Sequence, residues 1–264
     1  MTTELPDLVA AMALANRMAD MAGAIALRHF RTPLDVIAKA DESPVTVADR
    51  EVESALRAVL AEAAPADGIY GEEHGQERVD APFVWVIDPI DGTRSFITGS
   101  PLWGTLIGLL HHGRPVLGMI DIPFTRERWS ATASIGACLS GVPVRASGCE
   151  RLADARLYAT SPDIFVGRDR DAFAAVEREA GLRRFGGDCY SYGLLASGHV
   201  DLVVESGLQP YDYLPIAPII AAAGGVITDW NGEPLGLGSD GRVVAAATPA
   251  LHAAALKCIV QARA

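Results

Sequence analysis

The sequence predicts a mixed α/β protein, of the α+β kind, in which helix-rich and strand-rich layers share one core. Segments with helical periodicity alternate along the chain with short apolar runs such as residues 83–87 (FVWVI), which are typical of buried strands. No internal repeat, low-complexity tract or Pro/Ser-rich linker divides the 264 residues. We therefore expect a single folded unit over residues 1–264, with approximate halves at 1–145 and 146–264.

The N-terminal part is expected to contain two helices followed by two strands. Residues 5–30 have an apolar face with helical spacing, and Pro33 would end that helix. Thr46 is placed to cap a second helix, with Asp49 in its first turn. Short strands are expected at residues 69–73 and 83–87.

From residue 103 onward the pattern becomes rich in strands, and helices return later in the chain. The expected strands are a hairpin of 103–113 and 114–123, then 127–132, a pair around 138–144, and 156–160, 183–185, 199–206, 224–230 and 243–248. The expected helices are 171–180, 188–197, 211–223 and 249–260. Pro215 and Pro218 fall within the third of these helices, so we expect it to be bent or to begin later. The adjacent His111 and His112 are interpreted as an exposed hairpin tip rather than a metal site.

Composition narrows the classes of partner. The formal net charge is −11 and the sequence pI is about 5.0, which argues against nucleic acid or an anionic membrane as the main partner. A phosphorylated small molecule stays compatible if a bound cation supplies positive charge. The four cysteines form no CxxC pair, the N-terminus lacks the basic head of a signal peptide, and no apolar run reaches the roughly 18 residues of a membrane span. We expect a cytoplasmic protein with reduced thiols.

The stretch FVWVIDPIDGTRSF (residues 83–96) carries the first functional signal, because a core strand runs directly into two aspartates. Asp88, the Ile90 carbonyl and Asp91 would lie close together in the turn that follows the strand. Gly92 and Thr93 add backbone amides and a hydroxyl, which at a helix start would form an anion site. Mg²⁺ prefers such an oxygen set, usually completed by substrate phosphate. The alternative is a capped turn with Asp91 as the N-cap.

Two other acidic positions occur where predicted elements end or begin. Glu72 and Glu73 end the strand at 69–73; their alternative interpretation is a solvated acidic turn. Glu205 ends the strand at 199–206 and Asp212 begins the next helix, where it would also complement the helix dipole. Each position alone is unremarkable in a surface turn. Together, three acidic element ends from distant parts of the chain suit one metal-filled cleft.

Three motifs resemble one known family: GEE, WVIDPIDGTRSF and YDYLPIAPIIAAAGGVITDW. They are similar to the inositol-monophosphatase superfamily of Mg²⁺-dependent, lithium-sensitive phosphatases, and PVTVAD resembles the family segment that carries a Thr/Asp pair. The resemblance extends from Lys39 to the last helix. It implies a layered α/β/α/β/α sandwich of the inositol-monophosphatase and fructose-1,6-bisphosphatase type, a small phosphomonoester as substrate, and a homodimer.

The same resemblance implies a role for each matching residue. Two Mg²⁺ ions would be held by Glu72, Asp88, the Ile90 carbonyl, Asp91 and Asp212, and a third, weaker ion would lie near Glu72. The catalytic residues would be Asp49, Thr93 and Glu72, with Asp49 and Thr93 orienting the attacking water. The backbone amides of Gly92 and Thr93 would hold phosphate oxygens. The first half of the chain would then carry most of the metal site, and the second half would complete the active site.

The segments SFITGSPLWGTLIGLL and RFGGDCYSYGLLASG resemble the histidinol-phosphatase branch of this superfamily. Inositol phosphatases carry small or hydroxyl residues where Asp188 stands, and a carboxylate there would suit an ammonium group better than an inositol ring. Glu205 falls where the family contacts the leaving alcohol. Two acidic contacts would match the amine and imidazole of histidinol phosphate. The alternative for Asp188 is an N-cap of the helix at 188–197.

Aromatic and basic residues complete the expected substrate pocket. Trp103, Tyr190 and Tyr192 would line the imidazole, and core packing is the alternative for each. Arg94 and Lys39 would counter the acidic site or reach a neighbouring subunit, and the alternative is a plain surface charge.

Histidinol-phosphatase in histidine biosynthesis is the predicted function, and three alternatives remain. Inositol monophosphatase is the main one, with hydrolysis of phosphonucleotides or fructose bisphosphate behind it. A non-catalytic regulatory protein on the same fold is the third, although it would have no need to keep so many clustered carboxylates. The haloacid-dehalogenase type needs DxDGT, and the spacing of DPIDGT is one residue longer.

Overall fold

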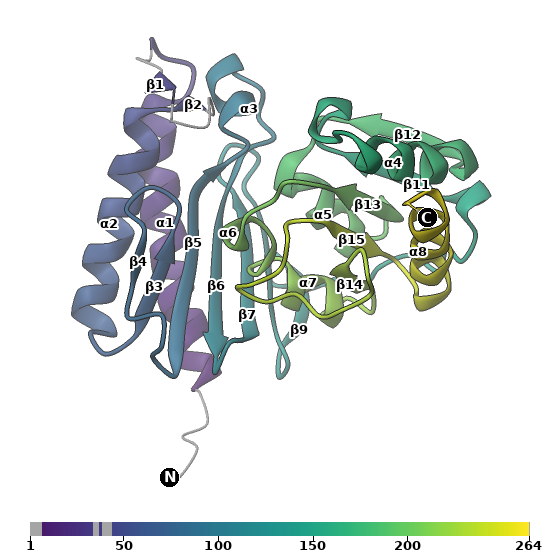
Figure 1. Ribbon diagram of the computed structural model, residues 1–264. Helices are drawn as coiled ribbons and strands as arrows, with labels where there is room; N and C mark the ends of the chain where they lie inside the picture. The colour runs from purple at the N-terminus through teal and green to yellow at the C-terminus, as the bar shows by residue number, and fades with distance from the viewer. Residues whose placement is uncertain (1–6, 34–36, 39–43, 264) are drawn as a thin grey trace.

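The computed structural model describes residues 7–33, 37–38 and 44–263, and these residues form five layers (Figure 1). Two helices cover one face of an eight-stranded sheet, a layer of short helices separates this sheet from a five-stranded sheet, and two further helices close the other side. A separate two-stranded ribbon pairs β1 (Ile37–Ala38) with β2 (Pro44–Val45). The expected layered sandwich is confirmed.

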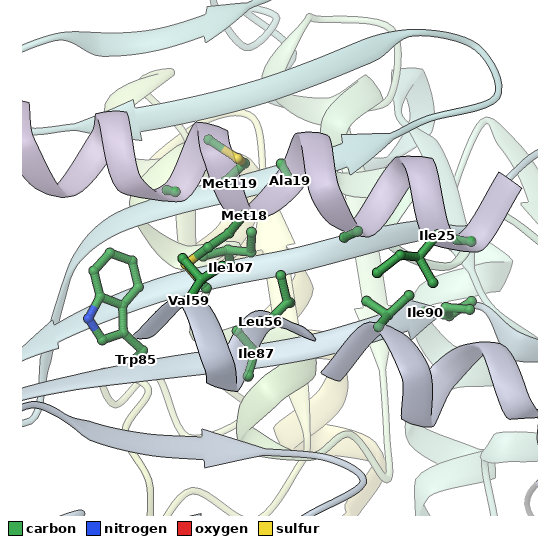
Figure 2. Close-up of a cluster of buried hydrophobic side chains, with 14 of the residues drawn as sticks. Met18, Ala19, Ile25, Leu56, Val59, Trp85, Ile87, Ile90, Ile107 and Met119 are labelled. Atoms are coloured by element: carbon green, nitrogen blue, oxygen red, sulfur yellow. The ribbon is translucent and has the colours of Figure 1, made fainter. Parts of the chain in front are cut away.

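The first layer consists of α1 (Leu8–His29) and α2 (Val47–Ala63). The side chain of Asp7 caps α1 by accepting from the amides of Val9 and Ala10, and Thr46 caps α2 as expected. Figure 2 shows the core beneath them, where side chains of both helices meet the sheet. The residues labelled there include Met18 and Ile25 of α1, Leu56 and Val59 of α2, and Ile87, Ile107 and Met119 of the sheet.

Helix α1 differs from the expectation about membrane spans. By length and apolar composition alone its 22 residues would suffice to cross a membrane. Core helices meet the same criterion, and here the face that carries Ala15, Met18 and Ala22 is fully buried against α2 and the sheet. The buried face accounts for the composition of α1.

The eight-stranded sheet has the order β10-β9-β8-β7-β6-β5-β3-β4. The strands are β3 (Gly68–Gly71), β4 (Gln76–Glu77), β5 (Phe83–Asp91), β6 (Gly104–His111), β7 (Arg114–Ile122), β8 (Glu127–Thr132), β9 (Gly136–Leu139) and β10 (Val142–Pro143). Among the described strands of this sheet, β3 and β5 are the one parallel pair, with Gly71 opposite Ile87. Because parallel strands end at the same edge of a sheet, the residues that follow Gly71 and Ile87 are brought together.

The middle layer contains α5 (Asp188–Ala196), α6 (Pro210–Tyr213) and α7 (Ala217–Ala222). The single helix expected at 211–223 is therefore broken, and the break carries Pro215 onto the sheet. Gly108 of β6 pairs with Gly118 of β7 beneath it. A Cβ on Gly118 would overlap the Pro215 carbonyl oxygen, and one on Gly108 would come within 3.0 Å of Pro215 Cα. The glycine pair lets the chain approach the sheet closely at this point.

The five-stranded sheet has the order β12-β11-β13-β15-β14. Its strands are β11 (Arg156–Ala159), β12 (Leu182–Phe185), β13 (Leu202–Glu205), β14 (Val226–Asp229) and β15 (Val243–Ala246). Its outer face is covered by α4 (Arg168–Glu179) and α8 (Pro249–Arg263). One apolar cluster contains residues of both sheets, including Leu106 and Ile120 from the large sheet and Val203 from β13.

Candidate active site

The first aspartates of the site stand at the end of β5, which runs to Asp91 rather than ending at Ile87 as expected. Asp88 is 2% exposed, and its Oδ1 accepts from the Ile90 amide at 3.0 Å. The pairing with β6 becomes irregular between Asp88 and Asp91. This irregularity allows two carboxylates three positions apart to face the same space.

Asp212 joins them from the first turn of α6. Asp88, Asp91 and Asp212 each present a carboxylate oxygen, and these oxygens lie within 4.8 Å of one another. Asp212 also accepts from the Gln209 amide at 2.7 Å, so it caps α6 as well. Asp212 thus lies in the acidic cluster and also stabilises the first turn of α6.

Burial and repulsion from neighbouring carboxylates raise the pKa of all three carboxyl groups of this cluster. Burial raises the pKa of Asp88 well above its ordinary value, and repulsion from Glu72 and Asp91 adds to the shift. Burial and the nearby Asp188 carboxylate raise the pKa of Asp91 to about 7, and burial with repulsion from Asp91 raises the pKa of Asp212. Ionised carboxylates this close need a cation among them, and an all-oxygen donor set fits a hard divalent ion such as Mg²⁺.

Glu72 follows β3 and belongs to the same space, because its charge contributes to the raised pKa of Asp88, Asp212 and Asp49. The turn after it is held by Glu53, which is fully buried in α2. Glu53 accepts from the amides of Glu73 (2.6 Å) and His74 (3.1 Å). Sequence reasoning missed Glu53; its signal was an acidic residue on the apolar face of α2.

An arginine neutralises the buried Glu53. Arg57, one helical turn later, donates from Nε to Glu53 Oε1 at 2.8 Å. The same guanidinium donates to the Gly75 carbonyl and to Glu77 Oε1. The pair therefore ties α2 to both ends of the turn between β3 and β4.

Asp49 and Thr93, expected to orient the attacking water, are each held by a local bond. Asp49 is 1% exposed and accepts from both the amide (2.8 Å) and the hydroxyl (2.6 Å) of Thr46. Burial raises the pKa of Asp49, and Glu72 adds to the shift. The Thr93 hydroxyl donates to the Ile90 carbonyl at 3.1 Å, which leaves that oxygen one further lone pair.

Gly92 caps the short helix α3 (Thr93–Thr98), with a left-handed φ of 80°. A helix thus begins directly after Asp91, as the anion-site interpretation requires. A Cβ on Gly92 would lie 2.8 Å from Asp188 Oδ2, so the Asp188 carboxylate lies directly over this glycine. The backbone amides expected to bind phosphate therefore lie beside the Asp188 carboxylate.

Asp188 is the first residue of α5 and has a left-handed φ of 43°. Its Oδ2 accepts from the Ser95 hydroxyl at 2.8 Å. Burial raises its pKa, while Ser95 and the charge of Arg94 oppose the shift. The N-cap of α5 is Gly187, so the interpretation of Asp188 as an N-cap is wrong. Arg94 is exposed and acts on Asp188 by its charge.

Glu205 lies at the end of β13 and is 1% exposed. Its Oε1 accepts from the amide (2.8 Å) and hydroxyl (3.0 Å) of Thr160. Burial raises its pKa to about 8, and the charges of Asp188 and Asp91 contribute. The Cys189 amide donates to Asp91 Oδ2 at 2.6 Å, which connects α5 to the aspartate cluster.

Two expected pocket residues are corrected by the structure. Trp103 is fully buried between Phe30 (ring centroids 5.2 Å apart) and Phe96 (4.8 Å), so it belongs to the core under α1. The Tyr190 hydroxyl donates to Glu127 at 2.9 Å, on the face of α5 that meets β8. Tyr192 lies about 200° further round α5 and is the tyrosine whose pKa is raised by burial and by Glu205. Lys39 falls outside the described residues.

Comparison with known proteins gives a consistent result. A model of the inositol monophosphatase family matches residues 7–264. A chloroplastic bifunctional phosphatase of Arabidopsis thaliana is 46% identical over 84% of this chain, a match that spans 64% of the plant protein. A histidinol-phosphatase of Chlorobaculum parvum is 36% identical over 91% of this chain and 92% of its own length. The solved structure of an inositol monophosphatase from Zymomonas mobilis is 43% identical, with a TM-score of 0.89 over 97% of this chain and 100% of that one.

Proposed function

This chain belongs to the inositol monophosphatase family of phosphatases, and on that premise we propose that it is a histidinol-phosphatase. It would hydrolyse L-histidinol phosphate to L-histidinol and phosphate, as a step of histidine biosynthesis. The family is generally metal-dependent, and the oxygen-only cluster of Asp88, Asp91 and Asp212 supports a hard cation such as Mg²⁺ here. The proposal includes two or three ions per site and sensitivity to lithium. A homodimer in the cytoplasm remains part of the prediction.

The observation that carries the choice of substrate is the carboxylate of Asp188. Ser95 donates a hydrogen bond to this side chain, the missing side chain of Gly92 leaves room for it over the proposed phosphate-binding turn, and Glu205 contributes a second carboxylate nearby. Two acidic groups beside the leaving group favour a cationic alcohol over a neutral polyol, because a charged hydrogen bond to an ammonium is stronger than one to a hydroxyl. The histidinol-phosphatase named above supports the same substrate.

Each part of the site has a role in this reaction. Glu72, Asp88, the Ile90 carbonyl, Asp91 and Asp212 would hold the ions, which lower the pKa of water and neutralise charge on phosphate and leaving alkoxide. The amides of Gly92 and Thr93 would bind phosphate oxygens at the start of α3. Asp49, fixed by Thr46, would accept a proton from the attacking water, and the Thr93 hydroxyl would orient that water.

Inositol monophosphatase is the second candidate function. Its support is the Zymomonas mobilis structure, which carries that name and is more similar in sequence than the Chlorobaculum parvum histidinol-phosphatase. In this case Asp188 and Glu205 would accept hydrogen bonds from ring hydroxyls. The metal and phosphate parts of the site would keep the same roles.

The two candidates are separated by phosphate release with Mg²⁺ from histidinol phosphate and inositol 1-phosphate at matched low concentrations. We expect a strong preference for histidinol phosphate in kcat/KM. Asp188→Asn should reduce that preference by about 10-fold or more, because it removes the charge but keeps an acceptor for Ser95. Asp163→Asn, on an exposed turn, is the matched control. A preference for inositol 1-phosphate would reject the proposed function.

A further inference from the structure

Two buried oxygens near the proposed site have no hydrogen-bond partner among the described residues. They are the hydroxyl oxygen Oη of Tyr192 and the carboxylate oxygen Oε2 of Glu205. Tyr192 is 3% exposed and Glu205 is 1% exposed. Buried polar atoms in folded proteins are nearly always hydrogen-bonded, and leaving one unpaired is costly. Two such atoms in one region therefore indicate a polar ligand group between them.

Both residues lie close enough to the aspartate cluster for the charge of Asp91 to raise the pKa of each. Tyr192 follows Asp188 by about one turn of α5. The charge of Glu205 raises the pKa of Tyr192 more than the charges of Asp91 and Asp212 do. The charge of Asp188 in turn raises the pKa of Glu205. The phenol thus sits among the carboxylates, on the opposite side of α5 from Tyr190.

Each of the two carboxylates has one oxygen in a hydrogen bond to a neighbour and one that remains, and the tyrosine contributes its single hydroxyl oxygen. Ser95 takes Oδ2 of Asp188, which leaves Oδ1. Thr160 takes Oε1 of Glu205, which leaves Oε2. Tyr192 contributes Oη. Three acceptors from α5 and β13 remain, and two of them carry negative charge when ionised.

We propose that Asp188, Tyr192 and Glu205 form an ammonium subsite for the amine of the substrate. An –NH₃⁺ group has three N–H donors and no acceptor, which matches three separate oxygens. Tyr192 is then a specificity-determining residue: its hydroxyl accepts one of the three hydrogen bonds, and its buried ring fixes the position of that oxygen. This inference rests on the proposed function, because it assumes a substrate that carries an amine.

A matched pair of substrates and a matched pair of variants test the subsite. The substrates are histidinol phosphate and its analogue that lacks only the amino group, and the measurement is the ratio of their kcat/KM values with Mg²⁺. Tyr192→Phe removes a single oxygen, and Tyr190→Phe makes the same change on the face of the same helix that bonds Glu127. We expect Tyr192→Phe to lower the wild-type ratio by about 10-fold or more, mainly through the KM of histidinol phosphate, while Tyr190→Phe leaves it unchanged.

Two results would overturn the proposal, and they differ in meaning. If the wild-type enzyme discriminates for the amine and Tyr192→Phe discriminates equally, the amine is bound elsewhere and the proposed function survives. If the wild-type enzyme treats both substrates alike, the subsite and the histidinol-phosphatase assignment fail together. Glu205→Gln keeps an acceptor for Thr160 and serves as the second variant, with an expected loss of the ratio at least as large. Thermal unfolding of each variant verifies that it is folded.

Discussion

At the scale of single residues, Asp91 connects the two functional regions of the site. One of its oxygens accepts from the Cys189 amide of α5, and its carboxylate belongs to the cluster with Asp88 and Asp212. Its pKa of about 7 reflects burial first and the Asp188 charge second. Asp91 therefore experiences a repulsion that a bound cation would relieve, and it also fixes the start of α5, where the proposed substrate contacts begin.

Replacement of Asp91 by asparagine separates these roles, because the amide oxygen can still accept from Cys189. We expect Asp91→Asn to reduce kcat/KM by at least about 100-fold, since changes to the partners of metal ligands alone cost about 10–100-fold. The metal-free variant should unfold at the same temperature as the wild type or a higher one, because repulsion is removed. Kinetics over a Mg²⁺ titration and metal-free thermal unfolding provide both measurements. Near-normal turnover would rule out the two-metal assignment.

Residue types predicted the acidic cluster better than they predicted the aromatic contacts. Carboxylates at strand ends are costly unless a cation is bound, so Asp88 and Asp91 stood out in the sequence itself. Aromatic residues are buried both in cores and in pockets, and each position along a helix turns the side chain by about 100°. The direction in which Tyr190 or Tyr192 points therefore depends on tertiary packing, which the sequence alone does not specify. For the same reason the sequence did not show that Trp103 is buried in the core.

At the scale of elements, the parallel pair β3 and β5 determines which acidic turns meet. This pairing places Glu72, which follows β3, beside the aspartates at the end of β5. The turn after β3 is held by a residue outside it, because its backbone amides donate hydrogen bonds to the buried carboxylate of Glu53. The position of Glu72, an expected metal ligand, thus depends on Glu53 of α2, which is not itself an expected ligand.

We predict that Glu53→Gln weakens metal binding and destabilises the fold. Gln loses the charge that pairs with Arg57 and turns an N–H toward backbone donors, and breaking a buried ion pair on one side costs about 3–5 kcal/mol. Urea unfolding measures that loss. The apparent Mg²⁺ affinity, measured by protection against thermal unfolding, should fall by about 10–100-fold.

Glu51→Gln is the control for this prediction. Glu51 lies in the same helix, but its side chain is 42% exposed and it pairs with Arg28 on the surface. We expect its loss to change stability by about 1 kcal/mol or less. If Glu53→Gln lost stability but kept the wild-type Mg²⁺ affinity, Glu53 would support the fold without positioning Glu72.

Helix and strand positions followed from the sequence, and the exceptions have local causes. The expected helix at 211–223 is split into α6 and α7 because Pro215 must approach the glycine pair of β6 and β7. The two prolines indicated a break in the helix. The glycines that Pro215 approaches are about 100 residues away in sequence, and the fold alone shows that they meet. Strand β5 is longer than expected because it continues through Asp88, which is buried. Charged residues are rarely buried unless they are paired, so the sequence indicated that the strand ends before Asp88.

At the scale of the whole molecule, the site lies where the two sheets approach each other. The large sheet supplies Asp88 and Asp91, α5 supplies Asp188, and β13 of the small sheet supplies Glu205. The apolar cluster that contains both Leu106 and Val203 holds the sheets together behind these residues. Layers and motifs were predictable from sequence, whereas the edges that meet follow from strand order, a property of long-range pairing.

The assembled site should make stability depend on pH in an unusual direction. Folding raises the pKa of Asp91 from 3.8 to about 7 and that of Glu205 from 4.5 to about 8. Between about pH 4 and 8 the folded protein therefore binds more protons than the unfolded chain, so the free energy of unfolding falls as pH rises. We expect the metal-free protein to be less stable at pH 8 than at pH 5.5, as measured by urea unfolding at both values.

Mg²⁺ should reverse this dependence, because it needs the carboxylates in their ionised form. At pH 8 the ion binds a deprotonated cluster and adds about 2.7 kcal/mol when its free concentration is 100 times Kd, whereas at pH 5.5 it competes with protons and adds less. Asp91→Asn removes one of the shifted groups, so it should flatten the pH dependence of the metal-free protein and reduce the Mg²⁺ gain at pH 8. An equal Mg²⁺ gain at both pH values would contradict the cluster as the metal site. A metal-free stability that rises from pH 5.5 to 8 would show that its carboxylates are ionised without a cation.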